Sequence, residues 1–141
     1  MKNILVPVDG SQHSVKALEV ALSMAKDSNE AKVHVVTVHP PIVSGNVTRF
    51  FSAENIKGYY EEEGAKALEP VKAQIQQAGD ICTQQVLVGP VAETIVEHAK
   101  AQGCDHIVMG TRGLGRVSGL VLGSITTKVI SLTHIPVTLV K

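Results

Sequence analysis

The sequence predicts an α/β domain, with a single doubly wound sheet of five parallel strands and helices on both of its faces. Five short apolar runs alternate with segments of helical periodicity, an order that requires right-handed crossovers between parallel strands. The chain of 141 residues is 44% hydrophobic but only 3% aromatic. Its core must therefore consist of Val, Ile, Leu and Ala, the usual filling of a sheet covered by helices. Its length suits one domain, and no linker divides residues 1–141.

The strand-like runs are rich in Val, Ile and Leu and occupy residues 4–8, 33–38, 81–88, 106–109 and 137–140. The first, second and fourth are nearly continuous in apolar residues, as expected of strands that are buried on both faces of a sheet. The third contains Thr83, Gln84 and Gln85. This polarity favours a position at the edge of the sheet.

Between the strand-like runs, apolar residues recur at the spacing of an amphipathic helix. Their stripes are Val15, Leu18, Leu22 and Ala25; Leu68, Val71 and Ile75; Ala92, Ile95, Val96 and Ala99; and Leu122, Ile125, Val129 and Leu132. Pro70 lies inside the second of these helices, so a kink or a late start is expected there.

One segment, from Pro40 to Ser52, has no clear periodicity and is longer than most connections. It follows the carboxyl end of a strand, where doubly wound folds bind their ligands. Two interpretations remain open for it: a lid over a ligand, or a surface loop pinned by Phe50 and Phe51.

Charge and composition exclude several classes of function. Thirteen basic residues balance thirteen acidic ones, so no bulk field attracts nucleic acid or an anionic membrane. No apolar run approaches the roughly 20 residues of a membrane span, and no signal-peptide pattern opens the chain; we expect a cytoplasmic protein. The six scattered histidines and the two cysteines, Cys82 and Cys104, show no metal-ligand spacing, and the cysteines fit buried hydrophobic positions.

The segment Gly110–Ser124 carries the functional signal. It leaves the fourth strand-like run, contains five glycines, and enters the last helix. Glycines let a backbone approach a ligand closely, and a helix N-terminus offers unpaired N–H groups at the positive end of its dipole. Arg112 or Arg116 adds charge, and Ser124 adds a hydroxyl group. This combination predicts a cradle for phosphate.

Two familiar phosphate loops are excluded. A Walker A loop places a lysine before the serine or threonine, but Gly123 precedes Ser124 directly. A dinucleotide fingerprint follows the first strand, where this chain has Asp9-Gly10-Ser11.

The remaining spacing is Gly110, two residues, Gly113, nine residues, then Gly123 and Ser124. This pattern resembles the G-2x-G-9x-G-S/T nucleotide motif of the universal stress protein family, in its ATP-binding branch. Residues 4–11, Ile-Leu-Val-Pro-Val-Asp-Gly-Ser, also resemble the opening strand and turn of that family. The resemblance covers the whole chain and implies a Rossmann-like sheet with strand order 3-2-1-4-5 and a role in the stress response.

Carried over residue by residue, the resemblance implies a nucleotide site. Pro7, Val8 and Asp9 would line the adenine and ribose, opposite the phosphates, with Val38 in the adenine wall. Met109 and Gly110 would lie against the ribose. The phosphates would be surrounded, mainly through backbone N–H groups, by Arg112, Gly113, Gly123, Ser124 and Ile125. The implied ligand is ATP, or else ADP or AMP, with Mg²⁺ or Mn²⁺ held through the phosphates. From the residues alone, Asp9 is equally suited to cap the first helix in competition with Ser11, and His39 fits a structural role.

No side chain near the glycine segment is a plausible base for hydrolysis at neutral pH, since Arg112, Arg116 and Lys128 are its only charged residues. The sequence therefore favours a nucleotide-binding regulator with no catalytic residues, at most a slow ATPase. The alternatives are an ATPase or phosphotransferase, and an interaction module that needs no nucleotide.

The apolar run at 135–140 predicts an edge strand with little charge to block pairing, and hence a homodimer through that strand.

Overall fold

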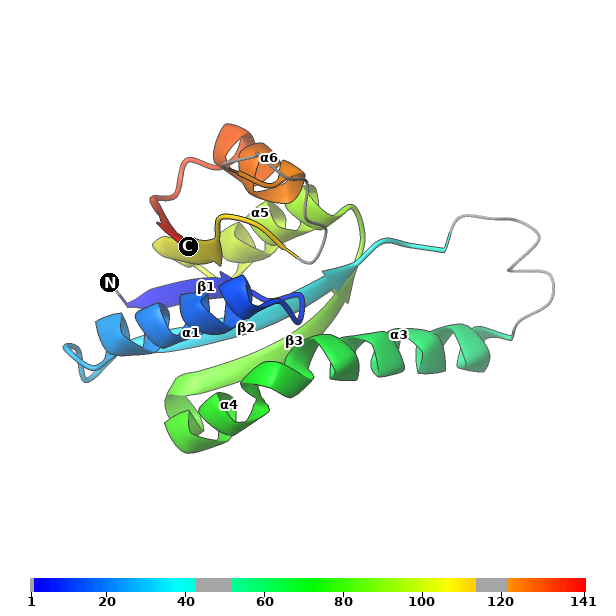
Figure 1. The fold of residues 1–141 in the computed structure, drawn as a ribbon, viewed down its shortest axis with the longest axis horizontal. Helices are drawn as coiled ribbons and strands as arrows, with labels where there is room; N and C mark the ends of the chain where they lie inside the picture. Colours follow the sequence, from blue (N-terminus) through cyan, green and yellow to red (C-terminus); the bar gives the residue numbers. More distant parts are fainter. Residues whose placement is uncertain (1, 43–51, 114–121) are drawn as a thin grey trace.

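A computed structural model of the protein describes residues 2–42, 52–113 and 122–141, which contain a parallel sheet of five strands (Figure 1). The strands are β1 (Asn3–Pro7), β2 (Lys32–His39), β3 (Cys82–Val88), β4 (His106–Gly110) and β5 (Val137–Val140). Their order is β3-β2-β1-β4-β5. The predicted fold class, strand order and two edge strands are thus confirmed. The loop residues Phe50 and Phe51, and Arg116 of the glycine segment, lie outside the described residues.

β1 is the centre of the sheet because both of its faces are apolar. Ile4, Leu5 and Val6 are all fully buried, with Ile4 and Val6 in one core cluster and Leu5 in the other. The alternation of side chains along a strand sends successive residues to opposite faces. A continuous apolar run therefore fits only a strand covered on both sides.

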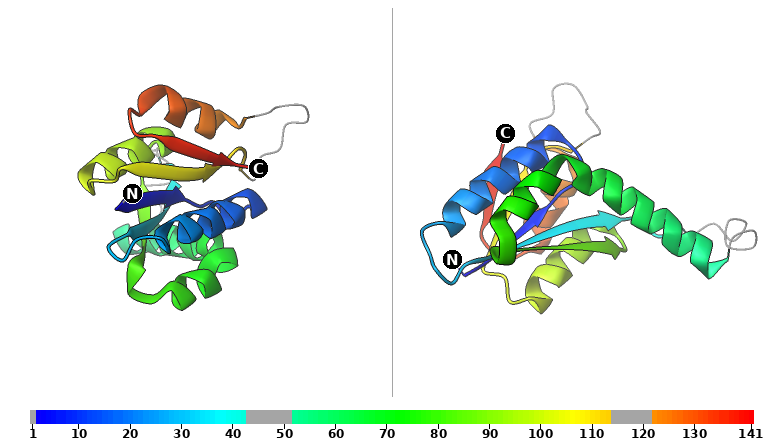
Figure 2. Two further views of the ribbon diagram at one scale, coloured as in Figure 1. Left: turned by 90° about the vertical axis from the view of Figure 1, so that its left-hand side faces the viewer. Right: turned by 90° about the horizontal axis from the view of Figure 1, so that it is seen from below.

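Helices cover both faces of the sheet (Figure 2). One core cluster joins the sheet to α1 (Gln12–Ala25) and to the segment that connects β2 with β3. That segment consists of α3 (Ala53–Leu68), a 3₁₀ turn (Glu69–Val71), α4 (Lys72–Ala78) and a second 3₁₀ turn (Gly79–Ile81). The other cluster joins the sheet to α5 (Val91–Ala101) and α6 (Ser124–Leu132). Among the described residues, no helix has the length and apolar character needed to cross a bilayer.

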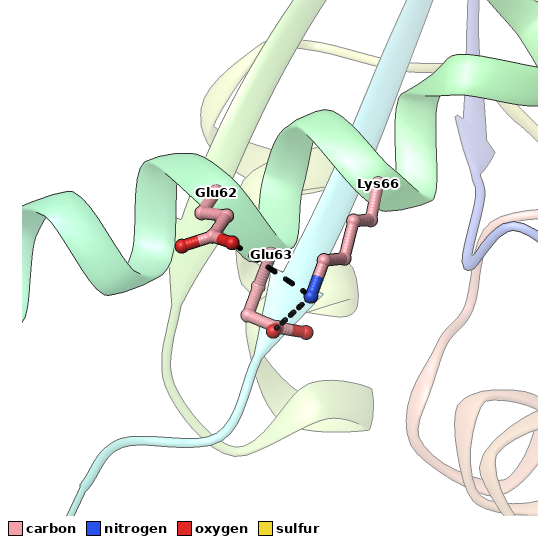
Figure 3. A network of polar contacts seen from close by, with 3 residues as sticks. All are labelled: Glu62, Glu63 and Lys66. Carbon is pink, nitrogen blue, oxygen red and sulfur yellow. Dashed lines mark hydrogen bonds and ion pairs between the residues drawn. The ribbon is translucent and has the colours of Figure 1, made fainter.

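The predicted interruption at Pro70 is confirmed. Pro70 lies in the 3₁₀ turn between α3 and α4, because proline lacks the N–H group that a continuing α-helix would need. α3, which precedes this break, projects past the end of the sheet (Figure 1). Its exposed surface carries ion pairs from Lys66 to Glu62 and Glu63, at 4.0 and 3.4 Å (Figure 3). Such exposed pairs contribute little to stability.

The predicted apolar stripe of the last helix is confirmed at Val129 but is wrong at Ile125 and Leu132. α6 buries Thr126 and Val129, whereas Ile125 and Leu132 are 39% and 42% exposed. Leu122 precedes the helix, which begins only at Ser124. The buried face is narrow because α6 packs mainly on α5, and Thr126 takes its place in that face through a hydrogen bond to the sheet.

Candidate ligand-binding site

A cavity of about 320 Å³ opens at the carboxyl ends of β1, β2 and β4. β1 pairs with β2 on one side and with β4 on the other, so the chain leaves these strands in opposite directions around the sheet. Such a switch point is where doubly wound folds bind ligands. The volume falls within the roughly 300–1,000 Å³ of small-molecule sites.

The residues predicted from the sequence come together in this cavity. All eleven line it: Pro7, Val8, Asp9, Val38, Met109, Gly110, Arg112, Gly113, Gly123, Ser124 and Ile125. Sequence reasoning missed five others, namely Ser11, Ser14, Val91, Ile95 and Thr126. Each of the five lies at or near the start of a helix that follows β1, β3 or β4. Their place after a predicted strand was the signal that would have found them.

One side of the cavity is apolar. Ile95 and Met109 are buried in the core cluster beneath α5, and Val38 and Val91 pack against that cluster. Val8, from the cluster on the opposite face of the sheet, completes the lining beside them. The surface they form suits a flat, largely apolar group.

The start of α6 provides hydrogen-bond donors on another side of the cavity. Its N-cap, Gly123, has an extended backbone and provides no side-chain cap. The first N–H groups of a helix have no partner within it, so the amides of Ser124 and Ile125 are available to an acceptor in the cavity. Together with the positive end of the helix dipole they form an anion-binding surface.

The amide of Gly123 itself is not available. It donates a hydrogen bond to the carbonyl oxygen of Thr111 at 2.7 Å, which corrects the expectation that the Gly123 N–H contacts phosphate. The bond closes the glycine segment on itself just before α6 begins. Gly123 therefore faces the cavity without donating to it.

The three motif glycines differ in how closely the surrounding residues approach them. None of them adopts the left-handed backbone conformation, which the described residues show at Gly10, Gly79, Gly89 and Gly103. A Cβ at Gly110 would lie 2.7 Å from Cβ of His13, and one at Gly113 would meet the Asp9 carboxylate. A Cβ at Gly123 would make only ordinary contacts, the nearest at 3.4 Å from Cα of Arg112. Packing within the described part of the chain thus accounts for glycine at 110 and 113 but not at 123.

Asp9 lies closer to the glycine segment than the sequence suggested. Its Oδ1 accepts a hydrogen bond from the amide of Ser11 at 2.9 Å, and its Oδ2 reaches Gly113. Ser11, not Asp9, is the N-cap of α1, since its hydroxyl accepts from the amide of Ser14. The turns after β1 and β4 meet because these strands are neighbours.

Asp9 and Arg112 are the ionisable side chains among the described residues that line the cavity. Lys128, which the sequence placed near the glycine segment, forms an ion pair with Glu93 that ties α6 to α5. The hydrogen bond from Lys128 lowers the pKa of Glu93 below its ordinary value. Lys128 is thus engaged by α5.

His39 and the two cysteines, which were also considered from the sequence, do not line this cavity. Cys82 and Cys104 are buried, and burial raises the pKa of each thiol to about 11. The imidazole of His39 forms a hydrogen bond with Thr37 at 3.1 Å. Within residues 2–42, 52–113 and 122–141, no three metal-ligating side chains gather as they would around an ion.

Comparisons with known proteins agree with this architecture. The sequence profile of the Universal stress protein family matches residues 1–141. The chain is 36% identical over 142 residues to universal stress protein MJ0531 of Methanocaldococcus jannaschii, an alignment that covers 99% of this chain and 82% of that protein. The solved structure of MJ0577, from the same organism, matches with a TM-score of 0.78 and 29% identity, over 99% of this chain and 95% of that one.

A further solved structure, of a universal stress protein in complex with cAMP, matches with a TM-score of 0.69 and 26% identity. That match covers 99% of this chain and 97% of the other. A family profile that spans the whole chain, and a relative at 36% identity, leave one assignment. The protein belongs to the universal stress protein family.

Proposed function

We propose that the protein binds an adenine nucleotide, ATP or else ADP or AMP, in the cavity between β1 and β4. In this proposal the base lies against Val38, Ile95 and Met109, and the phosphates lie at the start of α6. The observation that carries the proposal is the uncapped N-terminus of α6, which lies beside an apolar surface in one cavity.

Two further points support nucleotide binding. Packing against the described residues gives no reason for glycine at position 123, because a methyl group there would make only ordinary contacts with them. A close approach of ligand to the backbone gives it one. In addition, a relative of the same family was solved with a cyclic nucleotide, cAMP.

A divalent ion, Mg²⁺ or Mn²⁺, enters this proposal as part of the ligand. The described residues offer no cluster of ligands for an ion. Mg²⁺ commonly keeps several waters and binds through substrate phosphates. The ion would therefore arrive bound to the nucleotide. It would reduce the negative charge of the phosphates, and so their repulsion by the Asp9 carboxylate beside Gly113.

In the cell we propose a regulatory role in the stress response: occupancy of the cavity sets the conformation of the glycine segment and the surface offered to a partner. The glycine segment starts at the end of β4 and leads into α6. A ligand held at both ends of it would change its conformational freedom, and so couple binding to the surrounding surface.

The test is the retention of labelled ATP on a filter by the wild-type protein and by Gly113→Val. The wild type is expected to retain ATP, with saturation below millimolar nucleotide. The variant is expected to retain none while its circular dichroism stays unchanged, because the branched side chain displaces the exposed Asp9 carboxylate and enters the cavity. Absence of retention by the wild type at millimolar ATP contradicts the proposal.

A second candidate function, slow ATP hydrolysis, is favoured by one observation. The Asp9 carboxylate lies at Gly113, close to where the phosphates are proposed to bind, and a carboxylate there is able to orient water. Multiple turnovers that Asp9→Asn abolishes, without loss of ATP binding, would support hydrolysis. Turnover that is unchanged in Asp9→Asn would exclude Asp9 as the catalyst.

We also propose that two copies pair through β5. This strand is at the edge of the sheet, and Leu139 within it is 37% exposed. An edge strand without a partner leaves backbone groups unpaired, and a second copy related by a two-fold axis would satisfy them. Sedimentation at micromolar concentration is expected to give a dimer, and a monomer there contradicts the pairing.

A further inference from the structure

A buried hydroxyl group ties the start of α6 to the end of β4. Oγ1 of Thr126 donates a hydrogen bond to the carbonyl oxygen of Gly110 at 3.0 Å. Thr126 is only 4% exposed and lines the cavity. It is the third residue of α6, and Gly110 is the last residue of β4. The bond thus joins two elements that both contribute to the candidate site.

This bond and a second one lie on either side of the amides of Ser124 and Ile125, for which no described residue provides an acceptor. The Gly123 amide donates to Thr111 at 2.7 Å, immediately before α6 begins. The Thr126 hydroxyl makes its bond immediately after Ser124 and Ile125. Those two residues, whose N–H groups open the helix, therefore lie between two attachments to the end of β4. Donors held in place before the ligand arrives bind it at a lower entropic cost.

The same bond affects the charge at the site. The carbonyl oxygen of Gly110 carries partial negative charge and belongs to a residue that lines the cavity. An acceptor that faces an incoming phosphate would repel it. The hydroxyl hydrogen of Thr126 forms a hydrogen bond with this oxygen. The bond lowers the free-energy cost of burying the oxygen and offsets its negative charge.

We propose that Thr126 is a positioning residue for the phosphate groups of the nucleotide: through Gly110 it orients the first amides of α6 and engages the carbonyl oxygen that would oppose phosphate. This inference rests on the proposed nucleotide function and deepens it. It predicts that Thr126 matters for phosphate and not for the adenosine part, which is bound by the apolar residues on the other side.

The neighbouring threonine provides a matched control. Thr127 also donates its hydroxyl to a backbone carbonyl, that of Gly123, at 2.9 Å. It is exposed and does not line the cavity. Its acceptor, Gly123, lines the cavity, but the carbonyl oxygen of Gly123 also accepts the amide of Thr127 at 3.0 Å. Removal of the Thr127 hydroxyl group therefore deletes an equivalent bond and leaves that carbonyl oxygen with a donor.

The experiment measures Kd for adenosine and for ATP in the wild-type protein, Thr126→Val, Thr126→Ser and Thr127→Val. In Thr126→Val the Kd for ATP is expected to rise about tenfold, because the first amides of α6 lose their attachment to Gly110 and the carbonyl oxygen of Gly110 is left to oppose phosphate. The Kd for adenosine, which has no phosphate, is expected to change less than about twofold. Thr126→Ser keeps the hydroxyl group and is expected to restore the wild-type ratio of the two constants, and Thr127→Val to leave it unchanged. If Thr126→Val does not fold, Thr126→Ala removes the same hydroxyl group without added bulk.

The outcomes separate the two proposals. The role of Thr126 alone is overturned if the wild-type protein binds ATP and Thr126→Val has the same ratio of the Kd for adenosine to the Kd for ATP. Equal weakening of adenosine and ATP in Thr126→Val means a general structural role and overturns it as well. Wild-type protein that does not bind ATP overturns the proposed function and this inference with it.

Discussion

The carboxylate of Asp9 occupies the space that a Cβ atom at Gly113 would need. The contact joins the turn after β1 to the glycine segment after β4, and the Asp9 carboxylate is held there by the Ser11 amide. Glycine at position 113 is therefore linked to aspartate at position 9. The two positions form a unit at the mouth of the cavity.

The first prediction tests this unit. Gly113→Ala is expected to lower the free energy of unfolding by about 1 kcal/mol, since a small addition to a filled space costs this order. In the background of Asp9→Ser, which has a shorter side chain, the same substitution is expected to cost less. Urea denaturation of the four proteins checks the coupling, and additive effects would contradict the contact.

Substitution of Gly123, unlike that of Gly113, is expected to affect ligand binding and not stability. Gly123→Ala is expected to leave the free energy of unfolding within about 0.5 kcal/mol of the wild type, because its Cβ meets only ordinary contacts. Its affinity for ATP is expected to fall, because the methyl group stands where the ligand approaches the backbone. Calorimetric titration and urea denaturation of the same sample measure both properties. A variant that binds ATP as tightly as the wild type would remove the argument drawn from this glycine.

A pair of glycines in α3 separates helix propensity from packing. A Cβ at Gly64 would lie 2.5 Å from the nearer methyl carbon of Val86 on β3, whereas one at Gly58 would meet no atom of the described residues within 4 Å. Gly58→Ala is expected to stabilise the protein by about 0.5–1 kcal/mol, the usual gain in a helix interior. Gly64→Ala is expected to destabilise it, and Val86→Ala to reduce that cost. Thermal denaturation gives the signs, and stabilisation by Gly64→Ala would contradict the packing.

The two thiols are expected to react slowly. Burial raises the pKa of Cys82 and Cys104 to about 11, so at neutral pH almost none of either is the reactive thiolate. Labelling with a thiol reagent at pH 7 should be much slower in the folded protein than in urea. Rapid labelling of either cysteine under native conditions would show that its site opens.

Acid is expected to destabilise the protein partly through His34. Burial, and then the neighbouring His98, lower the pKa of His34 below 6.5. The unfolded chain therefore takes up a proton before the folded protein does. The contribution of neutral His34 to the free energy of unfolding is fully present above the unfolded pKa. It is lost as the pH falls through 6.5 toward the lowered folded pKa.

His34→Gln is expected to lessen this loss, since glutamine does not titrate and is able to keep a hydrogen bond to Asn3, which His34 contacts at 3.0 Å. Urea denaturation at about pH 7.5 and about pH 5 measures the change in unfolding free energy for both proteins. Equal changes in the two proteins would exclude His34 as a source of acid sensitivity.

Local patterns in the sequence predicted the five strands and a phosphate cradle in the glycine segment, whereas the strand order and the eleven cavity residues were implied by the resemblance to the universal stress protein family. Runs such as Ile4 to Val6 are apolar on both faces, and the motif glycines lie at fixed distances from the end of a strand. In a doubly wound fold the ends of such strands meet, so residues near them in sequence line one cavity. Ser11 and Thr126 were missed because no motif spacing marks them; only their position near the start of a helix that follows a predicted strand indicated them.

The errors arose where tertiary contacts decide. Apolar periodicity placed Ile125 and Leu132 in the buried face of the last helix, but that face is set by packing on α5 and by the bond of Thr126 to Gly110. The amide of Gly123 was expected to be free, yet it is taken by Thr111. Gly110, the partner of Thr126, and Thr111, the partner of Gly123, both lie more than ten residues away in sequence, so a helical pattern does not reveal either bond.

The most direct measurement is a crystal structure of the protein grown with saturating ATP and Mg²⁺. The proposal predicts adenine against Ile95 and Met109, and a phosphate oxygen within hydrogen-bonding distance of the Ser124 and Ile125 amides. ATP bound elsewhere, or a phosphate chain turned away from the start of α6, would contradict it.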